Sequence, residues 1–362
     1  MKEFTKYFIV ISLMFLGFWA CQPPTTSLSF SDADITYEGR ILMRDTVAEL
    51  IWPGTSVSIR FKGTGLSATL QDLDTANYYN VIIDDVPTAV IHTDTTKRHY
   101  VLASDLKKGV HTVQLFKRTE WDKGKTLFYG FKLHEGSKIL SPPKPKKRKI
   151  EFYGNSITCG YGNEDTSDQD RWFGYFQNNY ETYAAITARH FNAQYHCIAK
   201  SGIGITVSWF PMVMPEMYNR LDPTDSTSVW DFNGYVPDVV VINLFQNDSW
   251  IVTDPNNEQF INRFGEQAPA DTTIIQAYEN FVGSIRGQYP QAAIICALGN
   301  MDATKSGSAW PGYVQSAVLQ LNDPDIYTCF FPYKDTGGHP KVDEQRQMAS
   351  QLIKFIEANI DW

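Results

Sequence analysis

Hydrophobic and polar residues alternate along the first part of the chain. Runs such as SVSIRFKG (56–63), NYYNVIID (77–84) and HTVQLFKRT (111–119) place apolar residues at about every second position. Turn-forming residues separate these runs, as in PGT (53–55). A period of two is typical of strands with one buried face, and Gly, Pro and Asp favour turns between them. We therefore predict that residues 28–140 form an all-β sandwich of the jelly-roll type.

The pattern changes after SPPKPKKRK (141–149), which we interpret as a solvated linker. Beyond it, continuous apolar runs alternate with segments of helical period. The strand-like runs are 149–154, 194–202, 237–245, 292–300 and 326–332, and the helix-like segments are 181–191, 272–289, 308–322 and 342–360. Apolar strands that alternate with amphipathic helices indicate a parallel sheet with helices on both faces. Residues 150–362 are thus predicted to form a second domain of the α/β class.

The first 21 residues have the layout of an export signal. Two lysines precede an apolar stretch (8–20), which is too short to span a membrane, and Cys21 follows it. A Cys at this place resembles the cleavage site of bacterial lipoproteins, although Trp19 is bulkier than the usual residue there. We expect an exported protein, either an outer-membrane or periplasmic lipoprotein anchored only through Cys21, or a secreted protein without a lipid.

Charge and cysteine content exclude several classes of function. The formal net charge is −8. It becomes −9 without residues 1–21, which carry a net charge of +1. No basic stripe lies outside the linker, so we expect no nucleic-acid partner. The sequence has no CxxC or HExxH motif, so we predict no metal and no other cofactor. Cysteines 159, 197, 296 and 329 allow two disulfides in an exported protein, but free buried thiols are the commoner state in apolar runs.

Small and polar residues follow four of the predicted strands of the α/β domain. In chain order they are Ser156, Gly202, Asn247 and His339. The carboxyl ends of parallel strands form the binding edge of such a sheet, so these residues are predicted to meet there. Ser156 then serves as the nucleophile and His339 as its general base. The N–H groups of Ser156 and Gly202 and the Asn247 amide form an oxyanion hole, so the set favours acyl transfer.

Each of these residues also has a simpler interpretation. A serine between a strand and a helix is commonly a helix N-cap, and Asn247-Asp248 fits an ordinary turn. His339 precedes a proline and fits a surface loop. Gly204 competes with Gly202, which we choose. The occurrence of all four residues at strand ends nevertheless favours the catalytic interpretation.

The same segments resemble the SGNH hydrolases (the GDSL family), and within them carbohydrate esterase family 2. The similar segments are YGNSITCGYGN (153–163), SGIGI (201–205), VINLFQND (241–248), GGHP (337–340), WPGTS (52–56), LFKRTE (115–120) and MPEMYNR (214–220). The resemblance extends over nearly the whole chain after the signal. It implies a β jelly roll joined to a flavodoxin-like SGNH domain. It also implies a serine esterase that removes acetyl groups from plant polysaccharides.

Three positions depart from the family pattern. Asn155 replaces the Asp of the GDS motif, and we expect activity to survive because Asn keeps an acceptor. Phe245-Gln246 replaces Gly-Thr before Asn247, which places bulk near the oxyanion hole. Asp335 lies four residues before His339 instead of three. Asp335 is our candidate for the carboxylate that orients His339, and the alternative is a backbone carbonyl in a Ser–His dyad.

Tryptophans near the strand ends are candidates for contacts with sugar rings. We assign substrate binding to Trp209 and Trp250, because flat apolar faces stack on pyranoses. The sequence thus predicts an esterase that deacetylates xylan- or glucomannan-type polysaccharide or oligosaccharide. Two alternatives remain, namely an SGNH esterase or lipase acting on another acyl ester, and a catalytically silent lipoprotein that binds polysaccharide. The sequence makes no prediction of oligomeric state.

Overall fold

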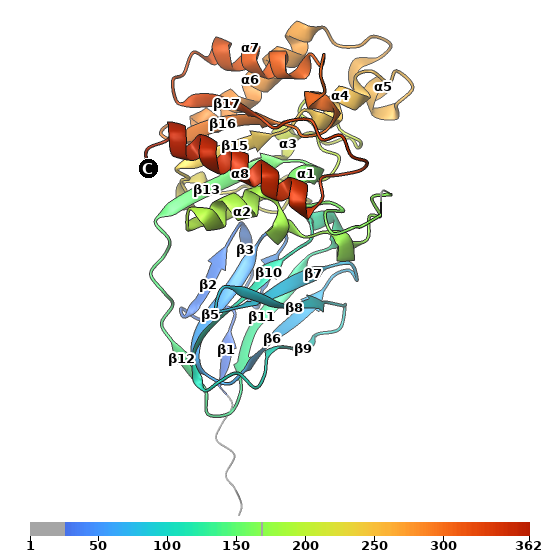
Figure 1. Ribbon diagram of the computed structural model, residues 1–362. Helices are drawn as coiled ribbons and strands as arrows, with labels where there is room; N and C mark the ends of the chain where they lie inside the picture. Colours follow the sequence, from blue (N-terminus) through green and yellow to red (C-terminus); the bar gives the residue numbers. More distant parts are fainter. Residues whose placement is uncertain (1–25, 168) are drawn as a thin grey trace, which may run out of the picture.

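The computed structural model describes residues 26–167 and 169–362, and the export signal with Cys21 lies outside them. The N-terminal domain is a sandwich of two antiparallel sheets, as predicted (Figure 1). One sheet has the strand order β3-β4-β11-β6-β9, with β1 on β11, and the other has the order β12-β5-β10-β7-β8, with β2 on β5. The strands are β1 (Ser27–Ser29), β2 (Ile35–Glu38), β3 (Ile41–Met43), β4 (Ala48–Leu50), β5 (Ser56–Gly63), β6 (Leu66–Asp72), β7 (Tyr78–Ile83), β8 (Val86–His92), β9 (Arg98–Ala103), β10 (Gly109–Lys117), β11 (Thr126–Leu133) and β12 (Lys138–Leu140).

The C-terminal domain is a parallel sheet of five strands in the order β14-β13-β15-β16-β17. The strands are β13 (Arg148–Gly154), β14 (Ala193–Ala199), β15 (Val239–Asn243), β16 (Ala293–Leu298) and β17 (Ile326–Phe330). The helices are α1 (Ser156–Cys159), α2 (Tyr183–His190), α3 (Met214–Met217), α4 (Gln246–Ile251), α5 (Glu258–Phe264), α6 (Asp271–Gln288), α7 (Trp310–Leu321) and α8 (Val342–Asn359).

Helices cover both faces of this sheet, as the continuous apolar strands predict. Val240 and Ile242 of β15 pack in the same core as α6 and α7. Val239 and Val241 of the same strand pack in the opposite core, with α2 and α8. Because neighbouring side chains of a strand point to opposite faces, a strand buried on both sides has to be apolar throughout.

A buried ionic cluster joins the two domains. Arg40 of the β-sandwich lies 3.6 Å from the Glu151 carboxylate in β13, and both side chains are buried. Tyr153 and Tyr289 also donate hydrogen bonds to Glu151. Burial raises the pKa of Glu151, but the nearby Arg40 charge, His196 and the Tyr153 hydrogen bond outweigh it and hold the pKa below its usual range. Polar contacts of this kind hold the domains in one arrangement.

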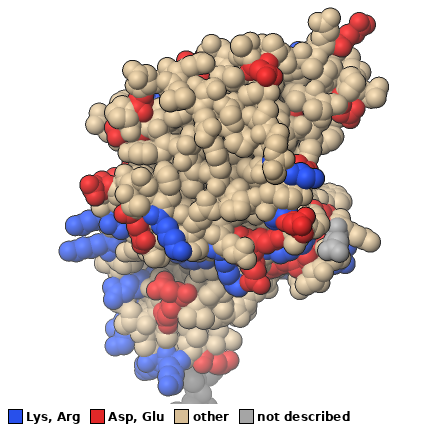
Figure 2. All heavy atoms as spheres, turned by 45° about the horizontal axis from the view of Figure 1, so that its top comes forward, with Lys and Arg blue, Asp and Glu red and all other residues tan. Residues whose placement is uncertain are grey.

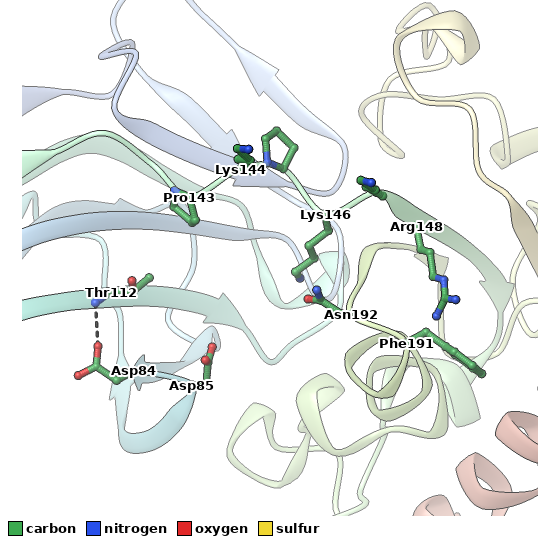
Figure 3. A pocket seen from close by; sticks show the side chains of 11 residues that line it. Asp84, Asp85, Thr112, Pro143, Lys144, Lys146, Arg148, Phe191 and Asn192 are labelled. Carbon is green, nitrogen blue, oxygen red and sulfur yellow. Dashed lines mark hydrogen bonds between the residues drawn. The ribbon is translucent and has the colours of Figure 1, made fainter. Parts of the chain in front are cut away.

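The linker passes a cavity of about 830 Å³ at the outer edge of the domain boundary (Figure 3). Asp84 and Asp85 line it from the β-sandwich, and Lys146 and Arg148 line it from the linker and β13. None of the predicted site residues is among those that line it. The cavity is therefore separate from the sheet edge at which the strands end.

Two further findings concern the cysteines and the helices of the described residues. Cys159, Cys197, Cys296 and Cys329 are buried and free, so no disulfide forms between them. Among the described residues, no helix has both the length and the apolarity that a membrane crossing requires.

Candidate active site

A tight junction between β13 and α1 presents Ser156. The Asn155 side chain caps the helix by accepting a hydrogen bond from the Ile157 N–H at 3.0 Å. Gly154 permits the close turn, because a Cβ there would lie 2.0 Å from the Thr158 hydroxyl. Ser156 therefore begins the helix, with only 5% of its surface exposed at the carboxyl end of the sheet.

The structure brings His339 to this serine, as predicted from the carboxyl edge that parallel strands share. His339 lies between β17 and α8, and its Nε2 is 2.8 Å from the Ser156 hydroxyl oxygen. The other ring nitrogen, Nδ1, lies 2.6 Å from a carboxylate oxygen of Asp170. A proton on Nδ1 leaves Nε2 free to accept the serine proton, which is the tautomer that a general base needs. The ring of Tyr161 packs against the imidazole, with centroids 4.9 Å apart.

Asp170 is held as a carboxylate by several donors. Its Oδ2 also accepts the backbone N–H of His339 at 2.7 Å, and its Oδ1 lies 3.0 Å from the Lys341 ammonium. Partial burial raises the pKa of Asp170, but the hydrogen bonds and charges of His339 and Lys341 outweigh it and hold the pKa at about 2. Gly338 makes room for this carboxylate, since a Cβ there would lie 2.4 Å from Oδ1.

The structure does not place Asp335 against His339. Asp335 is exposed, and among the described residues its side chain has no hydrogen bond or ion pair. It lines a separate cavity of about 470 Å³ with Lys334 and Glu344. The carboxylate that contacts the imidazole is that of Asp170. Asp170, which the sequence analysis missed, takes the position assigned to Asp335.

The order of the strands places the proposed oxyanion residues on either side of Ser156. Strand β13, which leads to Ser156, lies between β14, which leads to Gly202, and β15, which leads to Asn247. Among the hydrogen bonds of the described residues, the backbone N–H groups of Ser156 and Gly202 have no acceptor. Asn247 donates one amide hydrogen to the Ile203 carbonyl at 2.8 Å, which leaves its second hydrogen for a ligand. Three donors are thus available at one edge of the sheet.

Buried contacts fix the loops around these donors. Asp248 is fully buried and accepts the backbone N–H groups of Ile205 and Thr206 at 3.0 and 2.6 Å, so it braces the glycine loop. Trp209 is 49% exposed and donates its indole N–H to the Asn247 oxygen at 3.1 Å. Trp250, one turn beyond Asn247 in α4, instead donates to Asp302 at 2.8 Å.

The departure at Phe245-Gln246 does not crowd the oxyanion hole. Phe245 has a left-handed backbone with φ of 77°, the conformation that a glycine adopts readily. Its ring is fully buried against Tyr278 and Trp310. Gln246 is also buried and accepts the Ala303 N–H at 3.1 Å. The bulk expected near the oxyanion hole therefore lies in the core.

The sequence offered little indication of Asp170. The residue lies in a loop after the nucleophile block, where its only distinction is a polar, acidic neighbourhood (164–170). Its partner is 169 residues away in sequence, so no local spacing links the two. Within the described residues, no group of three or more His, Cys, Asp or Glu side chains is arranged to hold a metal ion.

Comparisons with known proteins agree on one family. Residues 37–143 match the model named carbohydrate esterase 2 N-terminal. The chain is 36% identical over 340 residues to the cellulase/esterase CelE of Acetivibrio thermocellus, which covers 91% of this chain and 40% of that protein. It is 26% identical to an acetylxylan esterase/glucomannan deacetylase of Cellvibrio japonicus, with 93% of this chain and 92% of that protein covered.

A solved structure is similar over most of the chain. It is a family two carbohydrate esterase from Clostridium thermocellum in complex with cellohexaose. Its sequence is 35% identical, 90% of this chain and 98% of that chain are covered, and the TM-score is 0.80. The chain spans only about two fifths of the A. thermocellus relative, but nearly all of the C. japonicus relative.

Proposed function

The chain belongs to carbohydrate esterase family 2, a family of carboxylic ester hydrolases, and we propose that it removes O-acetyl groups from plant polysaccharides or oligosaccharides. The observation that carries the proposal is the placement of His339. Its two ring nitrogens lie 2.8 Å from the Ser156 hydroxyl and 2.6 Å from the Asp170 carboxylate. Nucleophile, base and orienting carboxylate are thus joined in one line.

The first half of the reaction forms an acyl-enzyme. His339 Nε2 accepts the proton of the Ser156 hydroxyl while the oxygen attacks the acetyl carbonyl carbon. The negative charge that develops on the carbonyl oxygen is stabilised by the N–H groups of Ser156 and Gly202 and by the Asn247 amide. His339 then donates its proton to the sugar oxygen as the ester bond breaks. The sugar leaves with a free hydroxyl, and Ser156 carries the acetyl group.

The second half releases acetate. His339 removes a proton from a water molecule, and the water oxygen attacks the acetyl carbon of acyl-Ser156. The same donors stabilise the second tetrahedral intermediate, and the serine oxygen recovers its proton from His339. Asp170 remains a carboxylate throughout and stabilises the positively charged imidazole, in keeping with its low pKa.

The substrate that we propose is neutral acetylated polysaccharide of the xylan or glucomannan type. The relatives carry the names acetylxylan esterase and glucomannan deacetylase. In Figure 2 the upper, helix-covered part of the catalytic domain shows few Lys, Arg, Asp or Glu side chains, and the charged side chains gather lower in the view, towards the β-sandwich. Trp209, which touches Asn247 and is half exposed, is placed to stack on a sugar ring beside the oxyanion donors. Trp250 is assigned the same role further along α4.

The site of action that we propose is outside the cytoplasm. Support comes from the N-terminal sequence alone, in which two lysines, an apolar stretch and Cys21 follow one another. Lipidation of Cys21 would anchor the enzyme to a membrane at its N-terminus. Mass spectrometry of the N-terminus after expression in a Gram-negative host tests this directly, because a cleaved and acylated Cys21 has a distinct mass.

Acetate release tests the enzymatic proposal. The substrates are acetylated xylan, acetylated glucomannan and 4-nitrophenyl acetate, and the proteins are the wild type and Ser156→Ala. We expect release by the wild type and a loss of at least 10³-fold in the variant. A folded wild type that releases no acetate from any of them, and that a serine-reactive phosphonate does not label, would overturn the proposal.

A further inference from the structure

A carboxylate of the β-sandwich domain reaches the oxyanion loop of the catalytic domain. Glu120 follows β10, and none of its side chain is exposed. Its Oε2 accepts the backbone N–H of Ser201 at 2.7 Å, and its Oε1 accepts the Ser201 hydroxyl. Oε1 also accepts the side-chain amide of Gln177 at 2.9 Å. One buried carboxylate from the first domain therefore binds two loops of the second.

Both of these loops carry residues of the proposed site. Ser201 directly precedes Gly202, whose N–H is one of the proposed oxyanion donors. Because peptide groups are planar, only the φ and ψ angles of Ser201 separate the anchored N–H from that of Gly202. Gln177 lies at the end of the loop that begins after α1 and carries Asp170. Anchoring Ser201 therefore constrains the oxyanion donor directly, whereas Asp170 keeps its own contacts with His339 and Lys341.

Glu120 is itself rigidly held. Its backbone N–H donates to the Gln177 side-chain oxygen at 3.2 Å, so residues 120 and 177 are joined twice. The ammonium of Lys117, which is fully buried, lies 2.9 Å from the Thr119 carbonyl and 3.3 Å from that of Glu120. Because these contacts leave the Glu120 backbone little freedom, its side chain can hold Ser201 and Gln177 in fixed positions.

We propose that Glu120 is a positioning residue for deacetylation, through which the β-sandwich domain sets the oxyanion loop. This inference rests on the proposed function, because it assigns a purpose to the anchored Gly202 N–H. Glu120 acts on the reaction through Ser201 and has no hydrogen bond with Ser156 or His339 among the described residues. The β-sandwich is then part of the catalytic apparatus in addition to flanking it.

The expected effect is on the chemical step. A misplacement of about 1 Å in a catalytic group lowers the rate by as much as about 10²-fold, and removal of one oxyanion donor lowers it by about 10²–10³-fold. Glu120→Gln keeps the size of the side chain but replaces one acceptor oxygen with a donor, so it cannot satisfy Ser201 and Gln177 together. We expect kcat for 4-nitrophenyl acetate to fall about 10- to 100-fold, with KM changed less than about threefold.

Two further variants separate positioning from loss of stability. Asp222→Asn breaks another ion pair between the domains, that of Lys125 with Asp222, and leaves both loops untouched. It should lower the melting temperature without lowering kcat. The double variant Glu120→Gln/Gln177→Glu restores a carboxylate–amide pair in reversed order. We expect it to recover at least a third of the decrease in log kcat that Glu120→Gln alone causes.

Hydrogen exchange gives a readout that does not depend on activity. In Glu120→Gln, the backbone N–H of Ser201 should exchange at least tenfold faster than in the wild type, and in Asp222→Asn it should not. The pH dependence of kcat should keep its shape, because the contacts among Ser156, His339 and Asp170 remain.

The outcomes distinguish the two proposals. A wild type without esterase activity overturns the proposed function, while the exchange experiment still decides whether Glu120 anchors the loop. With an active wild type, an unchanged kcat in Glu120→Gln overturns the inference. Unchanged exchange at Ser201 overturns it as well, and so does an equal loss of kcat in Asp222→Asn.

Discussion

Replacement of Asp170 by Asn tests the arrangement that the structure adds to the sequence analysis. One oxygen of Asp170 accepts two donors from His339, its backbone N–H and Nδ1, at 2.7 and 2.6 Å. The other oxygen lies 3.0 Å from the Lys341 ammonium. Both positions therefore require an acceptor, and an amide supplies only one.

Either orientation of the Asn amide fails. If its nitrogen faces Lys341, two donors oppose each other at about the distance of a hydrogen bond. If it faces His339, it opposes the backbone N–H and forces the imidazole proton onto Nε2. That tautomer cannot accept the Ser156 proton. The known cost of this exchange in a Ser-His-Asp triad is about 10⁴-fold in kcat, so we expect a loss of about 10³–10⁴-fold, or about 4–5.5 kcal/mol in the activation free energy.

The assay is kcat/KM for 4-nitrophenyl acetate with a series of four proteins. They are the wild type, Asp170→Asn, Asp170→Asn/Lys341→Met and Asp335→Asn. Without Lys341 the amide can turn its oxygen to His339, so the double variant should regain at least tenfold over the single variant. Asp335→Asn should stay within about twofold of the wild type. The reasoning is refuted if Asp170→Asn keeps more than a tenth of the activity, or if Asp335→Asn shows the larger loss.

Three further predictions concern the donors and the buried charges. Asn247→Ala should lower kcat for 4-nitrophenyl acetate about 10²-fold, and a change of less than threefold would remove Asn247 from the oxyanion hole. Asn155→Asp should keep activity within a few-fold, because a carboxylate also caps α1. Asn155→Ala removes the cap, so its free energy of unfolding in urea should be lower by about 1 kcal/mol. Equal stability of the two variants would contradict the capping role. Burial lowers the pKa of Lys117 to about 8, whereas an unfolded lysine keeps a pKa near 10.5. Between these two pH values the unfolded state binds more protons than the folded state. The free energy of unfolding therefore rises with pH in that window. Between pH 8 and pH 10 the free energy of unfolding of the wild type, measured with urea, should rise by about 2 kcal/mol relative to that of Lys117→Met. If the free energies of unfolding of the two proteins change in parallel with pH, the ammonium is not buried in this way.

Periodicity predicted the architecture because it is a local property of each segment. The alternating runs before the linker correspond to strands with one buried face. The continuous apolar runs after it correspond to strands that are buried on both faces. The meeting of Ser156 with His339 followed in the same way, because the ends of parallel strands share one edge of the sheet.

Asp170 and Phe245 were beyond this kind of reasoning. Asp170 lies in a loop with no period, and its position depends on Gly338 and Lys341, which come from the far end of the chain. The Asp335 prediction came from the family pattern of an Asp shortly before the His, and the sequence does not show which way a loop side chain points. The side chain of Phe245 was expected near the oxyanion hole because Phe245 is close to Asn247 in sequence. The sequence does not show in which direction its ring points. Its left-handed backbone turns the ring into the core beside Tyr278.

The Arg40–Glu151 pair makes the stability of the catalytic domain depend on the β-sandwich. A gene fragment that begins at the linker would encode the Glu151 carboxylate, deep in the sheet, without the guanidinium that neutralises it. Removal of one partner from a buried pair costs about 3–5 kcal/mol, a large share of the 5–15 kcal/mol that stabilises a typical domain. A catalytic domain separated from the β-sandwich at this boundary should therefore be destabilised, so we expect the two domains to be inherited together.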